Sequence, residues 1–364
     1  MNVCFLLGSL HRNGGIGRVA ISLANSLCKD PSINVHMLCY SSREKGVFYS
    51  IDPDVKLDYL LEQHCNMKKA LLKGTHRKLR EYIKKNNIDV LVVCGVIYYL
   101  ISVLAIKKTK AKCLCWEHCN SMTTSDIAFE GIYRKIGAKK ADLVVTLTKR
   151  DKLEYQKQYK GVKVDQVYNS VDPKILENVK PYNPDTKKII SVGRLTYQKY
   201  FEKAVEVAAL VLPKFPDHTW HIYGGGEKKE DLQNQINAAG LNGRLILEGQ
   251  VNNIYDLYSE HSLLVMTSRY EGFPMVLLEG LGKNLPLVAF DIFTGPNEII
   301  HNGENGYLVE PFDTEGMAEK ICEILNDRDL RIKMSQNCKN YVGEFEHSAI
   351  VDRWKEIFKN LANS

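Results

Sequence analysis

The chain has 364 residues, of which 45% are hydrophobic, and this length predicts two domains with ordinary cores. No apolar run reaches the ~20 residues that a membrane-spanning helix needs, and the first residues, which carry no Lys or Arg, suit a strand better than a signal peptide. Residues 1–170 hold 28 Lys+Arg against 15 Asp+Glu, a net of +13, whereas the remainder holds 21 against 28, a net of −7. The basic first part predicts an anionic partner.

Apolar runs alternate with amphipathic stretches along the chain. The predicted strands are Asn2–Gly8, Asn34–Tyr40, Val90–Cys94, Lys112–Trp116 and Asp142–Thr146 in the first part, and Lys187–Val192, Thr219–Gly224, Arg244–Glu248, Leu263–Thr267 and Pro286–Phe290 in the second. Gly17–Lys29 predicts a helix between the first two strands. Strands that alternate with helices predict parallel sheets, and two such series predict two Rossmann-like α/β domains.

The division between the two series is expected near residues 170–186, where three prolines fall in the stretch Asp172–Asp185. The predicted domains are therefore residues 1–170 and 171–347. A terminal amphipathic helix is predicted at about 348–364, because Ile350, Trp354, Ile357 and Leu361 recur at helical spacing.

Ten cysteines are scattered through the chain, several of them inside apolar runs where free Cys behaves as a small hydrophobe. Without an export signal, this distribution predicts a reducing, cytoplasmic location. Cys113, Cys115 and Cys119 do not form paired C-x-x-C units, so no zinc site is expected.

A glycine-rich segment, Gly14-Gly15-Ile16-Gly17, follows the first strand and opens the first helix. Glycines allow amides at a helix N-terminus to approach a phosphate closely, although the same residues suit a simple tight turn. The spacing is not G-x-G-x-x-G, and Val35–Tyr40 runs into Ser41-Ser42-Arg43 without the acidic residue that would hold the NAD ribose. Nicotinamide chemistry is therefore not expected.

The segment Met67–Lys85 holds eight Lys+Arg and one acidic residue. Its apolar residues can form a stripe along one helix: Met67, Leu71, Leu72, Leu79 and Ile83. A basic amphipathic helix can lie on an anionic membrane surface, and a helix packed on its own sheet is the alternative. Nucleic acid is not expected as a partner, because aromatic–basic interleaving and known nucleic-acid motifs are missing.

Polar residues follow several predicted strands, at the edge where open α/β sheets bind ligands. His118 follows the predicted strand Lys112–Trp116, and its position at a strand end suits a functional role, although a single His can equally be structural. Arg194 and Lys199 follow the first strand of the second part and suit a diphosphate, or are solvated surface charges. Further strand ends carry residues that suit an open crevice floor or a simple turn, and backbone groups for a base: Gly224, Gly249 and Val251.

The segment Arg269–Glu279 places two glutamates, Glu271 and Glu279, around a turn and a helix start. Pro274 is predicted at the first helical position, where its missing N–H would be unpaired in any case. The amides that follow are free to meet an anion. Both carboxylates therefore suit one polar ligand that also carries phosphate.

These motifs resemble, in order, those of the retaining GT-B glycosyltransferases of family 4. The matching segments are the glycine-rich turn, Glu117-His118-Cys119-Asn120, Gly193-Arg194-Leu195 with Lys199, the spaced glutamates, Gly295–Ile300 and Asn305–Val309. The resemblance covers nearly the whole chain and is strongest over 187–320. It implies two Rossmann-like domains that face each other across a deep crevice, an acceptor domain and a donor domain, with the terminal helix crossing back to the first.

The resemblance also implies roles for individual residues. Arg194 and Lys199 would bind the donor diphosphate, and Glu279 the ribose hydroxyls. Glu271 and the amides around Gly272–Val276 would hold the transferred sugar, with His118 near it. The implied donor site further includes Gly14, Gly15, Gly17, Gly224, Gly249, Val251, Gly272, Phe273, Pro274, Met275 and Val276.

Two departures from the family pattern carry structural expectations. Tyr200 stands where the family often has Gly or Asn, which predicts a stiffer loop. Gly280 and Gly282 replace an Ala-rich helix end, which predicts a weaker helix.

The expected activity is retaining, metal-independent transfer of a hexose or N-acetylhexosamine from a nucleotide sugar, expected to be UDP-linked. No cofactor is expected, since cations and helix-end amides can meet the charge of the leaving diphosphate. Asp52-Pro53-Asp54 lies in a predicted loop away from the donor motifs. Retention normally suggests a carboxylate nucleophile, but none can be nominated, and the resemblance implies a same-face substitution.

The expected acceptor is a lipid-linked or growing surface glycan, which places the protein at the cytoplasmic face of the membrane through its basic first domain. A UDP-sugar epimerase of GT-B type and a non-catalytic nucleotide-sugar-binding partner are the alternatives.

Overall fold

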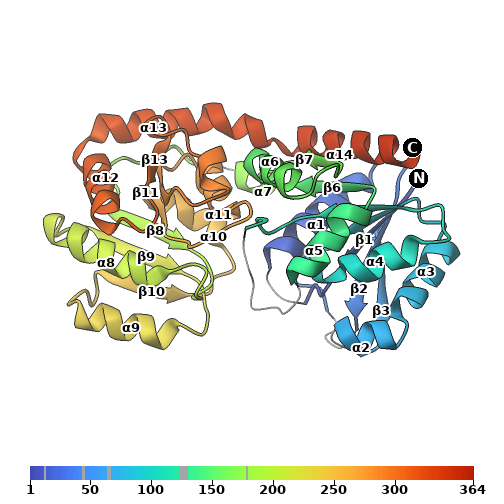
Figure 1. Cartoon of the computed structure of the whole chain (residues 1–364). Helices are drawn as coiled ribbons and strands as arrows, with labels where there is room; N and C mark the ends of the chain where they lie inside the picture. The colour runs from blue at the N-terminus through green and yellow to red at the C-terminus, as the bar shows by residue number, and fades with distance from the viewer. Residues whose placement is uncertain (12–13, 43–45, 64–66, 123–129, 178) are drawn as a thin grey trace. The chain divides into compact units, whose positions relative to one another are not determined.

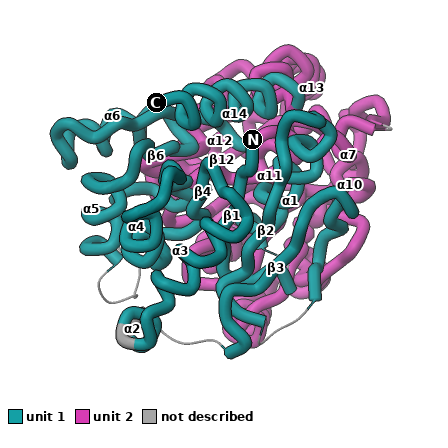
Figure 2. The backbone as a smooth tube through the Cα atoms, turned by 90° about the vertical axis from the view of Figure 1, so that its right-hand side faces the viewer, with its two compact units in different colours: residues 1–169, 348–364 teal, residues 170–347 magenta. Residues whose placement is uncertain are grey.

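The computed structural model describes residues 1–364 except 12–13, 43–45, 64–66, 123–129 and 178 (Figure 1). The chain forms two compact units, residues 1–169 with 348–364 and residues 170–347, which Figure 2 shows in different colours. Each unit is built on one parallel sheet with helices beside it, so the predicted α/β class is confirmed. Among the described residues, no helix has the length and apolar character that crossing a membrane requires.

The first unit contains a seven-stranded sheet in the order β3-β2-β1-β4-β5-β6-β7. Its strands are β1 (Asn2–Leu7), β2 (Asn34–Ser41), β3 (Lys56–Leu61), β4 (Val90–Val93), β5 (Lys112–Trp116), β6 (Leu143–Thr146) and β7 (Val164–Gln166). The central strands are continuous apolar runs because both faces of a parallel sheet are covered. The two edge strands, β3 and β7, are only partly buried and contain charged residues, so the apolar pattern did not predict them.

The helices of the first unit are α1 (Gly15–Leu27), α2 (Met67–Leu72), α3 (Thr75–Lys85), η1 (Val96–Tyr98), α4 (Tyr99–Ile106), α5 (Glu130–Lys140), α6 (Lys149–Gln158) and most of α14 (His347–Ala362). The prediction of one amphipathic helix over Met67–Lys85 is wrong. Gly74 lies between α2 and α3 with φ +69, a left-handed conformation that only glycine adopts at little cost. Leu79 and Ile83 of α3 are buried in the core, as the packed-helix alternative requires.

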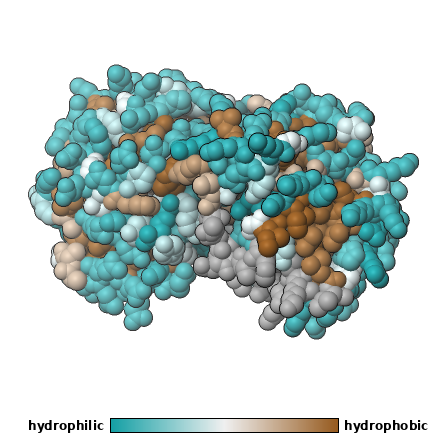
Figure 3. All heavy atoms as spheres, in the orientation of Figure 1, coloured by the Kyte–Doolittle hydropathy of each residue, from teal (hydrophilic) through white to brown (hydrophobic). Residues whose placement is uncertain are grey.

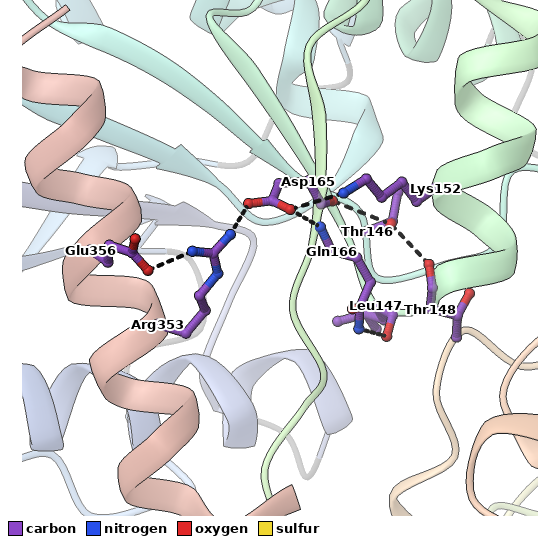
Figure 4. Close-up of polar contacts among 8 residues, drawn as sticks. All are labelled: Thr146, Leu147, Thr148, Lys152, Asp165, Gln166, Arg353 and Glu356. Atoms are coloured by element: carbon purple, nitrogen blue, oxygen red, sulfur yellow. Dashed lines mark hydrogen bonds and ion pairs between the residues drawn. The ribbon is translucent and has the colours of Figure 1, made fainter. Parts of the chain in front are cut away.

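Helix α14 is fixed to the first unit by an aromatic contact and an ion-pair network. The Trp354 ring lies 4.7 Å from that of Trp116 in β5 and is 1% exposed. Asp165 in β7 accepts from Arg353 of α14 at 2.6 Å and from Lys152 of α6 at 3.1 Å (Figure 4). Although burial opposes the effect, these two cations and the Gln166 amide lower the pKa of Asp165.

The second unit contains a six-stranded sheet in the order β10-β9-β8-β11-β12-β13. Its strands are β8 (Lys188–Val192), β9 (Thr219–Tyr223), β10 (Leu245–Gly249), β11 (Leu263–Met266), β12 (Leu287–Phe290) and β13 (Gly306–Val309). Its helices are α7 (Pro173–Leu176), α8 (Phe201–Val211), η2 (Leu212–Lys214), α9 (Lys229–Ala238), α10 (Ile254–Leu257), η3 (Tyr258–Glu260), α11 (Met275–Gly282), η4 (Pro296–Glu298), α12 (Thr314–Asn326), α13 (Arg328–Tyr341) and η5 (Val342–Phe345).

The proline-containing stretch after residue 170 is part of this second unit. Tyr182 donates its hydroxyl to the Ser262 carbonyl at 2.6 Å, and Arg331 donates to the Pro184 carbonyl at 3.0 Å. The stretch is therefore held against the unit by side-chain hydrogen bonds along its length.

Both sheets reverse their strand order beside the first strand of the unit, between β1 and β4 and between β8 and β11. In such sheets, the loops on the two sides of the reversal lead to opposite faces of the sheet and leave a crevice between them. In open α/β sheets, ligands bind at this position.

Candidate active site

Two loops at the reversal point of the second unit carry most of the charged residues that the sequence predicts for the site. The β8–α8 loop carries Arg194 and Lys199, and the β11–α11 loop carries Glu271. Because β8 and β11 pair directly, these loops begin side by side although they are about 70 residues apart in the chain.

The carboxylate of Glu271 is the centre of a buried polar cluster. Lys199 Nζ donates to its Oε1 at 2.6 Å, and Ser268 Oγ donates to the same oxygen at 2.8 Å. Gln198 Nε2 lies 3.3 Å from Oε2, and Glu271 is only 7% exposed. A carboxylate buried to this degree needs a compensating positive charge and hydrogen bonds. Removal of the Lys199 ammonium group would therefore leave the negative charge of Glu271 without its ion-pair partner.

Arg194 lies in the same β8–α8 loop as Lys199 but, in contrast to Lys199, is exposed to solvent. Its side chain is exposed, and no ion pair joins it to another residue within the described ranges. The guanidinium therefore keeps its forked donors available for an anion such as a phosphate.

Glu279 lies inside α11, is 4% exposed, and accepts a hydrogen bond from the Tyr258 hydroxyl at 2.5 Å. The prediction that Pro274 is the first helical residue is wrong by one position, since α11 begins at Met275 and Pro274 is the extended N-cap. The first hydrogen bond of the helix runs from Leu277 N to the Pro274 carbonyl at 3.0 Å. The amides of Met275 and Val276 precede that bond and point in the direction that favours an anion.

The glycine at 224 has a packing role that does not require a ligand. A Cβ there would lie 1.9 Å from the Gly193 carbonyl oxygen, and the residue has φ +146. Gly193 N donates to the Tyr223 carbonyl at 2.9 Å, and Gly224 N donates to the Gly249 carbonyl at 2.8 Å. The loops after β8, β9 and β10 are thus joined at their bases, with the partly buried Val251 following Gly249.

The turn that carries Glu271 is supported from the loop after β12. Thr294 Oγ1 donates to the Glu271 carbonyl at 2.7 Å, and a Cβ at Gly295 would lie 2.4 Å from Pro274 Cδ. Phe273 is buried behind this turn, next to Gly272. Sequence reasoning missed Ser268, Gln198, Tyr258 and Thr294, because uncharged polar residues in loops and short helices give no signal until their partners are known.

The glycine-rich segment Gly14–Gly17 of the first unit contains two glycines, Gly14 and Gly15, for which neither a left-handed backbone nor a close contact gives a reason. Gly14 is the extended N-cap of α1, and a Cβ at Gly14 or Gly15 would meet no described residue within 4 Å. Only Gly17 is restricted, since a Cβ there would lie 3.2 Å from Leu10 Cδ2. Neither Gly14 nor Gly15 is required by a positive φ angle or by a contact with a described residue, and a helix N-terminus of this kind suits a phosphate.

His118 follows β5 and is held from both sides. Its ring lies 4.3 Å from the Trp116 ring, and its Nε2 atom is buried without a hydrogen-bond partner among the described residues. Burial lowers the pKa of His118 to about 3, so that the imidazole is neutral at physiological pH.

The loop that carries His118 depends on a buried carboxylate next to it. Glu117 is 1% exposed and pairs with Arg134 of α5 at 3.0 Å, while the Tyr155 hydroxyl of α6 donates to the same oxygen. Glu117 also accepts from the Cys119 amide at 3.2 Å. Although burial opposes the effect, Glu117 raises the pKa of Arg134. Arg134 and Tyr155 were not predicted, since both come from helices far along the chain.

The cysteines considered for zinc and one further group of possible metal ligands lie in the first unit. Cys113 and Cys115 are buried in β5. Cys28, Asp52 and Asp54 form a group of possible ligands among the described residues, but Lys29 Nζ lies 2.6 Å from Asp52 and 3.5 Å from Asp54. The ammonium group of Lys29 therefore already compensates these carboxylates.

Comparison with known proteins agrees with this geometry. Residues 13–175 match the model of the Glycosyltransferase Family 4 domain, and residues 174–341 match that of the Glycosyl transferases group 1 domain. An uncharacterized glycosyltransferase of Haemophilus influenzae is 27% identical over 353 residues, which are 97% of this chain and 98% of that protein. The chain belongs to the family 4, group 1 glycosyltransferases and is an enzyme of that class.

Two further relatives extend the comparison. A Campylobacter jejuni α-1,4-N-acetyl-D-galactosaminyltransferase, named for an undecaprenol-diphosphate-linked glycan substrate, is 24% identical over 100% of both chains. The crystal structure of a mutant of S. aureus TarM with Fondaparinux, α-GlcNAc-glycerol and UDP superposes with a TM-score of 0.81 at 17% identity over 100% of both chains. The predicted GT-B type of fold, with two Rossmann-like domains, is confirmed by this match.

Replacement of Gly224 by Ala tests the close approach of the loops. We expect Gly224→Ala to destabilise the protein by about 1–3 kcal/mol, since the new methyl group would overlap a backbone oxygen. Gly225→Ala is the matched control, because a Cβ there meets nothing within 4 Å. Urea unfolding of both variants measures the difference, and equal midpoints would contradict the packing role.

The low pKa of His118 predicts the pH dependence of a His118→Gln variant. The unfolded chain protonates His118 near pH 6.5 and the folded chain near 3. The stability that neutral His118 permits is therefore fully present above pH 6.5 and is lost as the pH falls towards 3. Between pH 7 and 5, the wild type should lose about 1–2 kcal/mol more than the variant.

Urea unfolding at the two pH values measures this loss, and NMR of the labelled imidazole reports its protonation directly. A His118 resonance that titrates near pH 6.5 in the folded protein would show that the ring is not held in a desolvated site.

Proposed function

We propose that this glycosyltransferase moves a hexose or N-acetylhexosamine, with retention and without a metal ion, from a UDP-linked donor to a lipid-linked or growing surface glycan. The observation that carries the proposal is the pairing of two loops at one reversal point, which brings the Lys199–Glu271 ion pair and the start of α11 into one polar cluster. The UDP in the TarM complex and the lipid-linked substrate in the name of the Campylobacter relative support the choice of donor and acceptor.

In this proposal the exposed Arg194 and the partly buried Lys199 bind the donor diphosphate, together with the first amides of α11. Cations and helix-end amides stabilise the charge that develops on a leaving diphosphate, which is the role that Mg²⁺ has in other phosphate chemistry. Glu271 binds hydroxyls of the transferred sugar, and Glu279 binds the ribose. Gly14 and Gly15 give phosphate oxygens access to the start of α1, and His118 accepts or donates a hydrogen bond as a neutral group.

The substitution proceeds on one face of the sugar. The bond from the anomeric carbon to the diphosphate breaks, the acceptor oxygen bonds to that carbon, and the acceptor proton passes to the departing phosphate. A double displacement would need a free carboxylate nucleophile, whereas the Glu271 carboxylate already accepts from Lys199 and Ser268.

A donor screen with purified full-length protein tests this function. UDP-sugars are mixed with a polyprenyl-diphosphate-linked sugar, and the product is identified by mass. Glu271→Gln should lower kcat/KM by about 10²–10³, because it removes both the ion pair and the sugar contact. Glu319→Gln, an exposed position on α12, is the matched control.

The proposal fails if no donor is consumed, or if Glu271→Gln and Glu319→Gln behave alike. Conversion of the UDP-sugar without acceptor would instead identify an epimerase, and donor binding without any turnover would identify a non-catalytic binding protein.

We also propose peripheral contact of the first unit with an anionic membrane at the cytoplasmic face. The unit contains the basic helices α2 and α3, and α4 packs against both α3 and α5. Hydrophobic side chains gather over α4 and α5 in the view of Figure 3, and Ile132 of α5 is 52% exposed. An apolar surface next to basic helices suits an interfacial position.

Liposome flotation at two salt concentrations tests this contact. Binding to phosphatidylglycerol vesicles should exceed binding to phosphatidylcholine vesicles and should fall several-fold between about 50 and 500 mM salt, because salt screens exposed charges. Exchange of Lys69, Arg77 and Lys78 for Gln should weaken it, while the same exchange of Lys229, Lys333 and Lys339 in the second unit should not. Binding that ignores both salt and the first set would refute the electrostatic contact.

A further inference from the structure

The two loops that meet at the reversal point of the second unit are joined by more than the Lys199–Glu271 ion pair. Arg269 N donates to the Gln198 carbonyl at 2.8 Å, and Arg269 Nε donates to the Tyr197 carbonyl at 3.2 Å. Thr267 Oγ1 donates to the Lys199 carbonyl at 3.1 Å. These bonds run from the β11–α11 loop to three successive backbone carbonyls of the β8–α8 loop, which end at Lys199.

The Arg269 side chain also covers two aromatic rings of the opposite loop. Its guanidinium carbon lies 3.1 Å from the centroid of the Tyr200 ring and 4.2 Å from that of the Tyr197 ring. A planar guanidinium over an aromatic face gains cation–π and stacking energy that a lysine would not reproduce. Arg269 therefore binds the residues before and after the Gln198–Lys199 pair.

Tyr200 is the residue whose conformation most needs this support. It has φ 52 and ψ 45, a left-handed conformation that is unfavourable for any residue with a Cβ atom. It is also the N-cap of α8 and has no side-chain hydrogen bond to that helix. Its ring also lies 5.6 Å from the Phe312 ring in an edge-to-face arrangement, and Lys203 Nζ lies 5.9 Å from its centroid. Because Tyr200 lies between Lys199 and the first residue of α8, its backbone angles set the direction of the chain at Lys199 relative to that helix.

We infer that Arg269 is a positioning residue, whose side chain holds Tyr197 and Tyr200 so that Lys199, between them, stays within ion-pair distance of Glu271. We call Arg269, Tyr197 and Tyr200 the cross-loop clamp. The inference rests on the proposed donor-binding role of Lys199 and Glu271. Fixing a lysine side chain and the backbone around it costs conformational entropy. Because the clamp fixes the backbone of the loop in the absence of donor, donor binding does not have to order it. Displacement of a binding group by about 1 Å can cost about 10²-fold in rate.

The clamp differs in its consequences from a direct contact between Arg269 and the donor. If Arg269 acts through Lys199, its removal should matter little in a protein that already lacks the Lys199 ammonium group. If it binds the donor itself, the two losses should multiply, as they do for independent contacts.

A double-mutant cycle in the full-length protein separates these cases, with UDP affinity by calorimetry and donor kinetics as readouts. Arg269→Ala should weaken UDP binding and lower kcat/KM for the donor about 10–100-fold, with the acceptor KM within twofold of wild type. In the Lys199→Met background, Arg269→Ala should change UDP affinity less than threefold. Arg269→Lys should recover less than a third of the loss, and Arg328→Ala, at a surface ion pair, is the matched control.

Tyr200 supplies a second cycle. Tyr200→Phe keeps the ring and should stay within twofold of wild type. Tyr200→Gly removes both the ring and the strain, so Arg269→Ala should change kcat/KM less than threefold in that background. Amide hydrogen exchange gives a readout that needs no donor: Arg269→Ala should speed exchange at least tenfold in 194–200 and leave β12 unchanged.

Several results would overturn the clamp. These are unchanged exchange in Arg269→Ala, equal losses with and without Lys199, or a fall in melting temperature together with a proportional fall in acceptor binding. The proposed function fails separately, if wild type and Lys199→Met bind UDP equally. If Lys199→Met loses UDP and Arg269→Ala does not, only the clamp is refuted.

Discussion

The buried ion pair between Lys199 and Glu271 determines how the second unit presents its polar residues. A carboxylate removed from water is tolerated only with compensating charge and hydrogen bonds, and here these come from Lys199, Ser268 and Gln198. The compensation joins two loops that the reversal of strand order places side by side. The close approach at Gly224 and the support from Thr294 hold the same two loops from their other sides.

The first unit also compensates a buried carboxylate next to a strand-end loop, but with other groups. Its β5 loop is fixed by the buried Glu117, which pairs with Arg134 and accepts from Tyr155. Both partners come from helices that flank the sheet, and not from a neighbouring loop. His118 is therefore a neutral group beside a buried, compensated carboxylate, whereas the second unit also presents an exposed charge, Arg194, next to its buried ion pair.

The features that could be predicted from the sequence are those that depend on a continuous local pattern. Central strands appeared as apolar runs, and Arg194, Lys199 and Glu271 appeared as charges at strand ends. The edge strands β3 and β7 are partly exposed and carry no such run. The apolar stripe predicted one helix over Met67–Lys85, but the left-handed conformation of Gly74 interrupts it and separates α2 from α3. Ser268, Gln198 and Thr294 could not be found, because their role exists only when distant loops meet.

Helix α11 shows how close packing limits the ways in which such an enzyme can diversify. The expectation of a weak helix end took account of propensity alone. In the fold, a Cβ at Gly280 would lie 2.8 Å from Leu287 Cδ2, and one at Gly282 would lie 2.6 Å from Ile175 Cγ2. Every residue from Val276 to Gly282 is buried. Mutational libraries aimed at new donors should therefore leave this helix untouched and vary the exposed loop positions, where a changed side chain has room and the backbone keeps its path.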